Sequence, residues 1–251
     1  MFIDVHCHLD MLKDLDSVVG RARKAKVDLI VAQGVDIETN RHVLDLVNKY
    51  KEVKAALGIY PMDALKLSDK EIDKEIAFIK KNAKKIVAIG EVGIDYKESE
   101  GEKERERQKK IFRKFVSLSM DLDKPIIIHS RKAEEECIEI LEEMKAKKVI
   151  MHCFCGKKKF VSRIKENGWY ITVPTSVVRS EQFQEIAKDF PIDRLFCETD
   201  APFLYPFKSF SEEKNESAFV VESYKKIAEL RKMKLEDVEN QIEKNYKKLF
   251  C

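Results

Sequence analysis

The chain has 251 residues, of which 44% are hydrophobic and 37% are charged, and its formal net charge is +3. This apolar content excludes a chain that is disordered throughout, and no run approaches the roughly 18 apolar residues that a membrane-spanning helix needs. The nearly balanced charge neither requires nor excludes a nucleic-acid partner, because a local basic patch can form on a balanced protein.

Short β-branched runs alternate with longer, charged amphipathic segments along the whole chain. In chain order, the expected elements are strand 2–6, helix 15–26, strand 28–33, helix 39–51, strand 54–59, helix 68–82, strand 86–89, helix 102–120, strand 126–128, helix 133–145, strand 149–151, helix 160–167, strand 169–173, helix 181–189, strand 194–197 and helices 217–231 and 235–249. Strands of nearly continuous apolar character, each followed by a helix, indicate a parallel sheet covered by helices.

Eight consecutive strand–helix units predict an α/β fold of the (β/α)8 TIM-barrel type, with residues 1–251 forming a single domain. An open doubly wound sheet is the alternative, and eight units in a row favour the closed barrel. No linker, low-complexity segment or change in composition marks a second domain. The longest irregular stretch, 203–216, follows the last strand, which is a position on the catalytic face of a barrel.

The first predicted strand ends in two histidines spaced by two residues. Side chains at positions i and i+2 of an extended strand point to the same face, so His6 and His8 converge on one spot. Neutral imidazole is a good ligand for divalent transition metals. A solvated histidine pair near the N-terminus has the same pattern, so the metal-site interpretation depends on the rest of the chain.

The later predicted strands supply further side chains of the ligand type at their carboxyl ends: Glu91, His129, His152 and Asp200. In a barrel these strand ends share one rim. Core filling does not explain four histidines on that rim, because each buried imidazole would need its own hydrogen-bond partners. The fifth histidine, His42, lies in the middle of a predicted helix, and we interpret it as a surface residue.

Six residues of the ligand type exceed what one catalytic metal takes, which is usually three protein ligands and water. They suit two divalent metal ions about 3.5–4 Å apart, bridged by a carboxylate and a hydroxide. We expect His6 and His8 to hold one ion, and His129 and His152 to hold the other. Glu91 is the expected bridge, because a carboxylate offers two oxygens.

Asp200 is expected to ligate the first metal and to act as the catalytic general base. A bridging water that is acidified by two cations supplies hydroxide near neutral pH, and the metals stabilise charge on the attacked group. Zinc, manganese and magnesium all remain candidates for the two ions, because sites of histidine and carboxylate accept each of them.

Five motifs stand in order along the chain: His6-Cys7-His8, Gly90-Glu91-Val92-Gly93-Ile94-Asp95-Tyr96, Ile128-His129-Ser130-Arg131, His152-Cys153-Phe154-Cys155-Gly156 and Glu198-Thr199-Asp200-Ala201-Pro202. Together they resemble the TatD family of metal-dependent deoxyribonucleases, which belongs to the amidohydrolase superfamily of (β/α)8 barrels. The resemblance covers essentially the whole chain. It implies the same six metal ligands, with Asp200 at the reaction centre and Glu91 in the place where the superfamily often uses a carbamylated lysine.

The third predicted strand departs from the family pattern. It ends in Gly58-Ile59-Tyr60-Pro61, whereas the family usually has Gly-x-His-Pro with a substrate-side histidine. Tyr60 can still donate a hydrogen bond to a phosphate oxygen. Arg131 is the other expected substrate-binding residue, and an ion pair at a helix N-terminus is the alternative role for its guanidinium. Phe203 and Trp169 can stack a base, although Trp169 begins a strand and core packing suits it better.

These features predict a divalent-metal-dependent DNA phosphodiesterase, an exonuclease-type deoxyribonuclease that acts on single strands or ends. The same site would also attack a carbonyl carbon, so hydrolysis of small amides or esters, or of aminoacyl-tRNA esters, stays open. A third alternative is a metal-binding interaction protein without catalysis, against which the complete ligand set argues. The sequence indicates no membrane association and no obligate protein partner. Six cysteines without CxxC pairs and the lack of a signal-peptide pattern predict a cytoplasmic location.

Overall fold

The computed structural model describes residues 1–208 and 214–251. In these residues the strands are β1 (Phe2–Cys7), β2 (Val27–Gly34), β3 (Val53–Leu57), β4 (Ile86–Gly93), β5 (Ile126–His129), β6 (Val149–Met151), β7 (Tyr170–Pro174) and β8 (Leu195–Glu198). They form one sheet in the order of the sequence. The β1 strand also lies beside β8, since the His8 amide donates to the Ala201 carbonyl over 2.8 Å. This order confirms the predicted (β/α)8 barrel.

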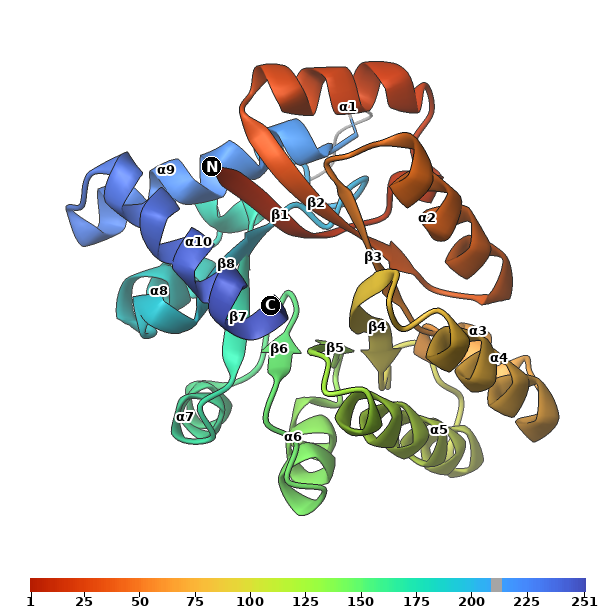
Figure 1. Cartoon of the computed structure of the whole chain (residues 1–251). Coiled ribbons are helices and arrows are strands. Elements are labelled where there is room, and N and C mark those ends of the chain that lie inside the picture. The colour runs from red at the N-terminus through yellow and green to blue at the C-terminus, as the bar shows by residue number, and fades with distance from the viewer. Residues whose placement is uncertain (209–213) are drawn as a thin grey trace. The chain divides into compact units, whose positions relative to one another are not determined.

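The helices alternate with these strands (Figure 1). In the described part of the chain they are α1 (Leu15–Lys24), α2 (Ile37–Lys49), α3 (Pro61–Leu65), α4 (Asp69–Lys81), α5 (Glu102–Asp121), α6 (Glu134–Glu143), α7 (Lys158–Glu166), α8 (Glu181–Asp189), α9 (Val220–Arg231) and α10 (Leu235–Phe250). The α3 helix was not predicted from the sequence, because five residues are too few to show an apolar period. Its start is nevertheless marked by Pro61, which occupies a first-turn position where its missing N–H costs nothing.

The chain divides into two compact units. Unit 1 comprises 1–32, 46–54 and 170–251, and it holds β7, β8, β1 and most of β2. Unit 2 comprises 33–45 and 55–169, and it holds most of β3 together with β4, β5 and β6. The assignment of residues 1–251 to one catalytic domain stays a prediction. Part of the predicted loop 203–216, namely 209–213, lies outside the described residues.

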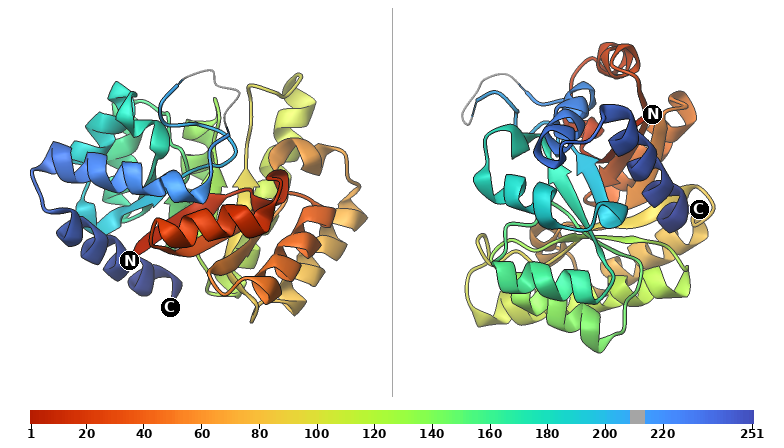
Figure 2. Two further views of the ribbon diagram at one scale, coloured as in Figure 1. Left: turned by 90° about the horizontal axis from the view of Figure 1, so that it is seen from above. Right: turned by 90° about the vertical axis from the view of Figure 1, so that its left-hand side faces the viewer.

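In unit 1, α9 and α10 lie side by side and cover β1 and β8 (Figure 2). The inner face of α9 carries Val220, Tyr224 and Ile227 at helical spacing, and all three are fully buried. The Tyr224 hydroxyl accepts from the Ile3 amide over 2.9 Å and donates to the Ile3 carbonyl over 3.1 Å. This contact fixes the strand that carries His6 and His8.

In unit 2, α5 covers β4 and packs against α3. The close approach of β4 to β5 depends on Gly93, whose φ of 151° favours glycine. A Cβ atom at this position would collide with the carbonyl oxygen of His129. The glycine of the fourth-strand motif therefore allows close contact between the strands that carry the predicted ligands Glu91 and His129.

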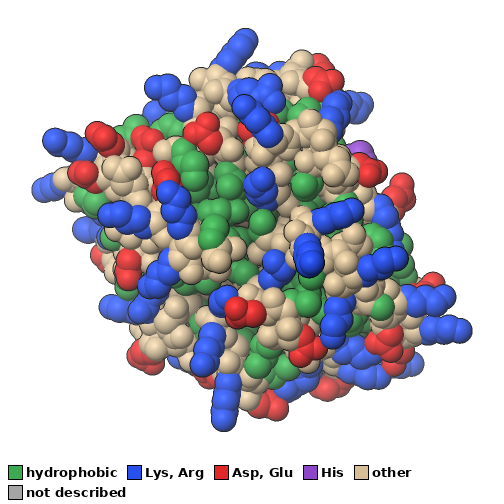
Figure 3. Space-filling model, viewed as in Figure 1, with side chains coloured by type: hydrophobic (Ala, Val, Ile, Leu, Met, Phe, Trp, Pro, Cys, Tyr) green, Lys and Arg blue, Asp and Glu red, His purple; other side chains and the backbone are tan. Residues whose placement is uncertain are grey.

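The surface carries both signs of charge. Figure 3 shows Lys and Arg side chains interspersed with Asp and Glu on the face that it draws, in keeping with the balanced composition. Among the described helices, none has the length and apolar character that crossing a membrane requires. The cytoplasmic location expected from the sequence stays a prediction.

Candidate metal centre

The strands β1 and β8 bring His6, His8 and Asp200 together in unit 1, and we call these three residues the first cluster. Both imidazoles are buried, and their Nε2 atoms lie 3.3 Å apart. The Asp200 Oδ1 atom lies 3.6 Å from Nε2 of His6 and 3.5 Å from Nε2 of His8. The sequence predicted this convergence from the spacing of the two histidines and from the end of the last strand.

The first cluster fits a divalent metal ion. A tetrahedral ion with ligand bonds of about 2.0–2.2 Å separates its ligand atoms by roughly 3.3–3.6 Å. The three measured separations, 3.3, 3.5 and 3.6 Å, match that triangle. Two imidazole nitrogens and a carboxylate oxygen are also a donor set that zinc and similar transition metals accept.

Asp200 is held in place by the backbone of β1. Its φ of 55° lies in the left-handed region, where aspartate is one of the few residues tolerated without glycine. Its amide donates to the His6 carbonyl over 3.0 Å. The preceding residue, Thr199, donates from its amide and from its hydroxyl to the buried Asp4 carboxylate, over 2.9 and 2.7 Å.

Asp4 is a buried site residue that was not predicted from the sequence. Its signal was an acidic residue two positions before His6 in an otherwise apolar strand, which places its side chain on the same face as the histidine. Burial raises the pKa of Asp4 to about 7, against the lowering effect of the hydrogen bonds from Thr199. A buried acid therefore connects the end of β8 to β1 beneath the first cluster.

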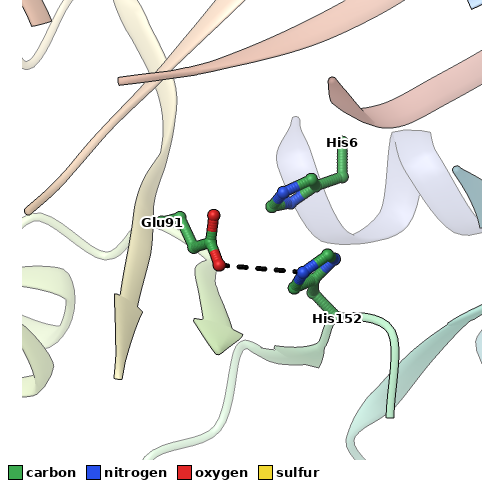
Figure 4. Close-up of side chains that lie close together, drawn as sticks. All are labelled: His6, Glu91 and His152. Atoms are coloured by element: carbon green, nitrogen blue, oxygen red, sulfur yellow. Dashed lines mark ion pairs between the residues drawn. The ribbon is translucent and has the colours of Figure 1, made fainter. Parts of the chain in front are cut away.

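A second cluster lies in unit 2, where β4, β5 and β6 bring Glu91, His129 and His152 together. The Glu91 Oε1 atom lies 2.8 Å from Nδ1 of His129 and 3.7 Å from Nε2 of His152. Figure 4 draws the ion pair between Glu91 and His152. The two imidazole rings stack with their centroids 6.3 Å apart. One carboxylate oxygen thus faces nitrogens from two neighbouring strands.

In the second cluster, His129 lies between two carboxylates. Its Nε2 atom is 2.9 Å from Oδ2 of Asp95, on the opposite side of the ring from Glu91. Burial alone would lower the pKa of His129, but the hydrogen bonds to Asp95 and Glu91 outweigh burial and raise it. When Nε2 carries the hydrogen, the Nδ1 lone pair and a Glu91 oxygen face each other, and only a proton or a metal ion between them removes the repulsion.

The structure places the two predicted substrate-binding residues as follows. The Tyr60 hydroxyl donates to Oδ2 of Asp95 over 2.7 Å, and its ring meets His129 edge-on with centroids 4.9 Å apart. Burial, followed by the hydrogen bond to Asp95, raises the pKa of Tyr60. Arg131 is 50% exposed and lies 3.7 Å from the Glu98 carboxylate. The role of both residues in binding substrate stays a prediction.

Three aromatic and histidine predictions can be compared with the structure. Trp169 is buried, and its Nε1 donates to the Ala146 carbonyl over 2.9 Å, so core packing is confirmed and base stacking is excluded. Phe203 is 52% exposed, and its ring meets His8 edge-on with centroids 6.1 Å apart. His42 is exposed, as predicted.

Comparison with known proteins gives a consistent result. A family model described as TatD related DNase matches residues 3–251. The uncharacterized metal-dependent hydrolase YabD of Bacillus subtilis is 35% identical over 100% of this chain and 99% of its own length. The deoxyribonuclease TATDN3 of Homo sapiens is 31% identical over 99% of this chain and 94% of its own length. The crystal structure of YJJV, a TatD homologue from Escherichia coli, has a TM-score of 0.90 at 27% identity, covering 99% of this chain and 97% of that one.

Proposed function

The chain belongs to the TatD family and is a metal-dependent hydrolase, and from this membership we propose that it hydrolyses phosphodiester bonds in DNA. The family model is described as a DNase, and the human relative is named a deoxyribonuclease, which supports this choice of substrate. The observation that carries the proposal is the first cluster, whose three ligand atoms have the separations that a divalent ion requires.

We propose that two divalent metal ions are bound, one by the first cluster and one by the second. All six proposed ligands lie in the last residues of parallel strands or just after them, and in a (β/α)8 barrel these strand ends share the catalytic rim. Glu91 would supply the carboxylate that the two ions share. Zinc, manganese and magnesium are the candidate ions.

Bound divalent cations would acidify a coordinated water and stabilise the negative charge that develops on the attacked phosphate. Asp200 is the proposed general base, since it follows β8 and its carboxylate lies beside the imidazoles of His6 and His8. Oδ1 of Asp200 faces the imidazoles, and Oδ2 would accept the proton from the attacking water. The Asp4–Thr199 hydrogen bonds hold the residue that directly precedes Asp200.

The substrate side of the proposal uses Arg131 and Phe203. The guanidinium of Arg131 can donate two parallel hydrogen bonds to phosphate oxygens. Its present partner Glu98 is half exposed, and an exposed ion pair of this kind is weak enough to exchange for a phosphate. Phe203 offers a half-exposed ring beside the ligand His8, and such a ring can stack an unpaired base. A stacked base favours single strands or frayed ends as the substrate.

The test is digestion of end-labelled single-stranded DNA by metal-stripped protein, with magnesium, manganese or zinc added back. Wild type is compared with His129→Ala, which removes a ligand, and with His42→Ala, which removes an exposed histidine of α2 as a matched control. We expect stepwise shortening that needs metal, persists in His42→Ala and disappears in His129→Ala. DNA that stays intact under every metal would refute the nuclease proposal and direct the search to carbonyl substrates, beginning with aminoacyl esters.

The preference for unpaired bases has its own test. Phe203→Ala is expected to raise KM for single-stranded DNA by about tenfold, because base–aromatic stacking contributes about 1–3 kcal/mol per base. Met120→Ala, which also shortens an exposed apolar side chain, is the control. Equal KM values in wild type and both variants would exclude stacking on Phe203 while leaving the hydrolytic reaction in place.

A further inference from the structure

The Asp95 carboxylate is fully buried and surrounded by four hydrogen-bond partners. Its Oδ1 atom accepts from the backbone amides of Lys97 and Glu98, over 2.8 and 3.1 Å. Its Oδ2 atom accepts from the Tyr60 hydroxyl over 2.7 Å and lies 2.9 Å from Nε2 of His129. Each oxygen therefore has two partners, and the two backbone amides fix which oxygen faces the imidazole.

This arrangement determines the tautomer of His129. Two backbone amides, which can only donate, point at Oδ1 of Asp95, and the Tyr60 hydroxyl donates to Oδ2, so both oxygens are held as acceptors of a carboxylate. An ionised carboxylate can only accept hydrogen bonds. Nε2 of His129 must therefore carry the hydrogen, and the lone pair of a neutral ring is left on Nδ1, the atom that faces Glu91.

We propose that Asp95 is a positioning residue that keeps Nδ1 of His129 available as a metal ligand, and that Tyr60 holds Asp95 in place. The inference rests on the proposed function in one respect, the role of His129 as a ligand. An outer carboxylate that accepts the second N–H of a metal-bound histidine fixes both its tautomer and its ring orientation. The Tyr60 hydroxyl thus orients the carboxylate that orients His129, and it does so from the position at which the family usually has a histidine.

Asp95→Asn tests the positioning role, because the neighbouring donors determine the orientation of the new side-chain amide. Its oxygen has to face the amides of Lys97 and Glu98, since an NH2 group there would meet two donors. The NH2 group then faces Tyr60 and His129. The tyrosine hydroxyl can turn and accept, but the imidazole can accept only by moving its hydrogen to Nδ1. The substitution keeps the shape of the site and removes the lone pair that would bind the metal.

The experiment is a calorimetric titration of metal-stripped protein with zinc and, separately, with manganese. Long-range 1H–15N NMR of the His129 ring under the same conditions reports the tautomer. In Asp95→Asn we expect binding at the second cluster to weaken about 10–100-fold, with binding at the first cluster unchanged. Tyr60→Phe should weaken metal binding at the second cluster less than tenfold. Tyr60→His should bind there with wild-type affinity. Tyr96→Phe removes a hydroxyl within the same motif and should bind as wild type does.

Wild-type affinity and a hydrogen on Nε2 in Asp95→Asn would overturn the inference. So would a His129→Ala variant that binds both ions as wild type does, because His129 would then not be a ligand. None of these readouts requires DNA hydrolysis. A protein that cleaves no DNA but loses the second ion in Asp95→Asn would contradict the proposed substrate and support the positioning role. A protein that cleaves DNA and keeps both ions in Asp95→Asn would contradict the positioning role alone.

Discussion

Replacing Tyr224 by phenylalanine tests how the strand that carries His6 and His8 is held. The Tyr224 hydroxyl is fully buried and makes two hydrogen bonds to one residue of β1, accepting from the Ile3 amide and donating to its carbonyl. The substitution removes only this oxygen. The ring remains, and with it the edge-on contact with Phe2, whose centroid lies 4.9 Å away.

The expected loss of stability follows from the two backbone groups that are left behind. A buried donor or acceptor without its partner costs about 1–3 kcal/mol. Two such groups on Ile3, partly relieved by local adjustment, should lower the free energy of unfolding by about 3 kcal/mol. For a chain of this size, that loss corresponds to a decrease in Tm of roughly 6–12 °C.

The assay is urea unfolding of metal-stripped protein followed by circular dichroism. Tyr246→Phe is the matched control, because it removes a tyrosine hydroxyl from α10 and keeps a ring that stacks on Phe250 at 4.4 Å. The control should change the unfolding free energy by less than about 0.5 kcal/mol. A Tyr224→Phe variant that is as stable as the control would refute the reasoning, because it would mean that the Ile3 groups do not depend on the hydroxyl.

Three further outcomes follow from the two clusters. Asp200→Asn should leave the circular dichroism spectrum unchanged and lower kcat by about 10²–10⁴-fold, and near-normal turnover would remove Asp200 from the mechanism. In metal-free protein, the stability difference between wild type and Asp95→Asn should be largest between about pH 4 and 6.5 in chemical unfolding. The pKa of Asp95 is lowered to about 2 from its usual 3.8, so the stabilisation from its carboxylate is present above pH 4 and is lost on acidification. The pKa of His129 is raised, so the stabilisation from its imidazolium is present below pH 6.5 and is lost at higher pH. A stability difference that does not depend on pH would contradict this coupling. Zinc at a hundred times its Kd should stabilise wild type by about 2.7 kcal/mol for each site occupied, measured as a rise in Tm. A rise of the same size in His129→Ala would argue against the second site.

The barrel could be predicted from the sequence because its signal is local. Runs such as 126–128 and 149–151 are continuously apolar, as buried parallel strands are, and each is followed by an amphipathic helix. The positions of the ligand residues followed from the same rule, since each lies where an apolar run ends. The α3 helix escaped prediction because five residues are fewer than the roughly 11–18 over which helical periodicity can be recognised.

The hydrogen-bond networks around the ligands could not be predicted in the same way. Tyr60 and Asp95 are 35 residues apart in the sequence, and nothing in either local pattern shows that the hydroxyl of one meets the carboxylate of the other. Asp4 and Thr199 are separated by 195 residues. Such contacts depend on which strands become neighbours and on the rotamers that packing selects. The sequence therefore predicted where the candidate ligands lie but not the residues that hydrogen-bond around them.

Asp4 and Asp95 are both buried, but their pKa values shift in opposite directions because their hydrogen-bond partners differ in charge. This difference gives a last prediction. Asp4 accepts hydrogen bonds from neutral donors, among them the His6 amide and the amide and hydroxyl of Thr199. The effect of burial therefore exceeds that of the hydrogen bonds and raises the pKa of Asp4 to about 7. Asp95 faces His129, which can carry a positive charge, and its pKa falls to about 2.

The same difference decides what asparagine does at each position. In Asp4→Asn the oxygen can still accept from both amides, and the NH2 group faces the Thr199 hydroxyl, which can turn and accept. Asp4→Asn should therefore bind both metal ions with wild-type affinity in the calorimetric titration, whereas Asp95→Asn should bind the second ion about 10–100-fold more weakly. Loss of metal binding in both variants would mean that any buried carboxylate near the ligands is needed for its charge, and the tautomer argument would fail.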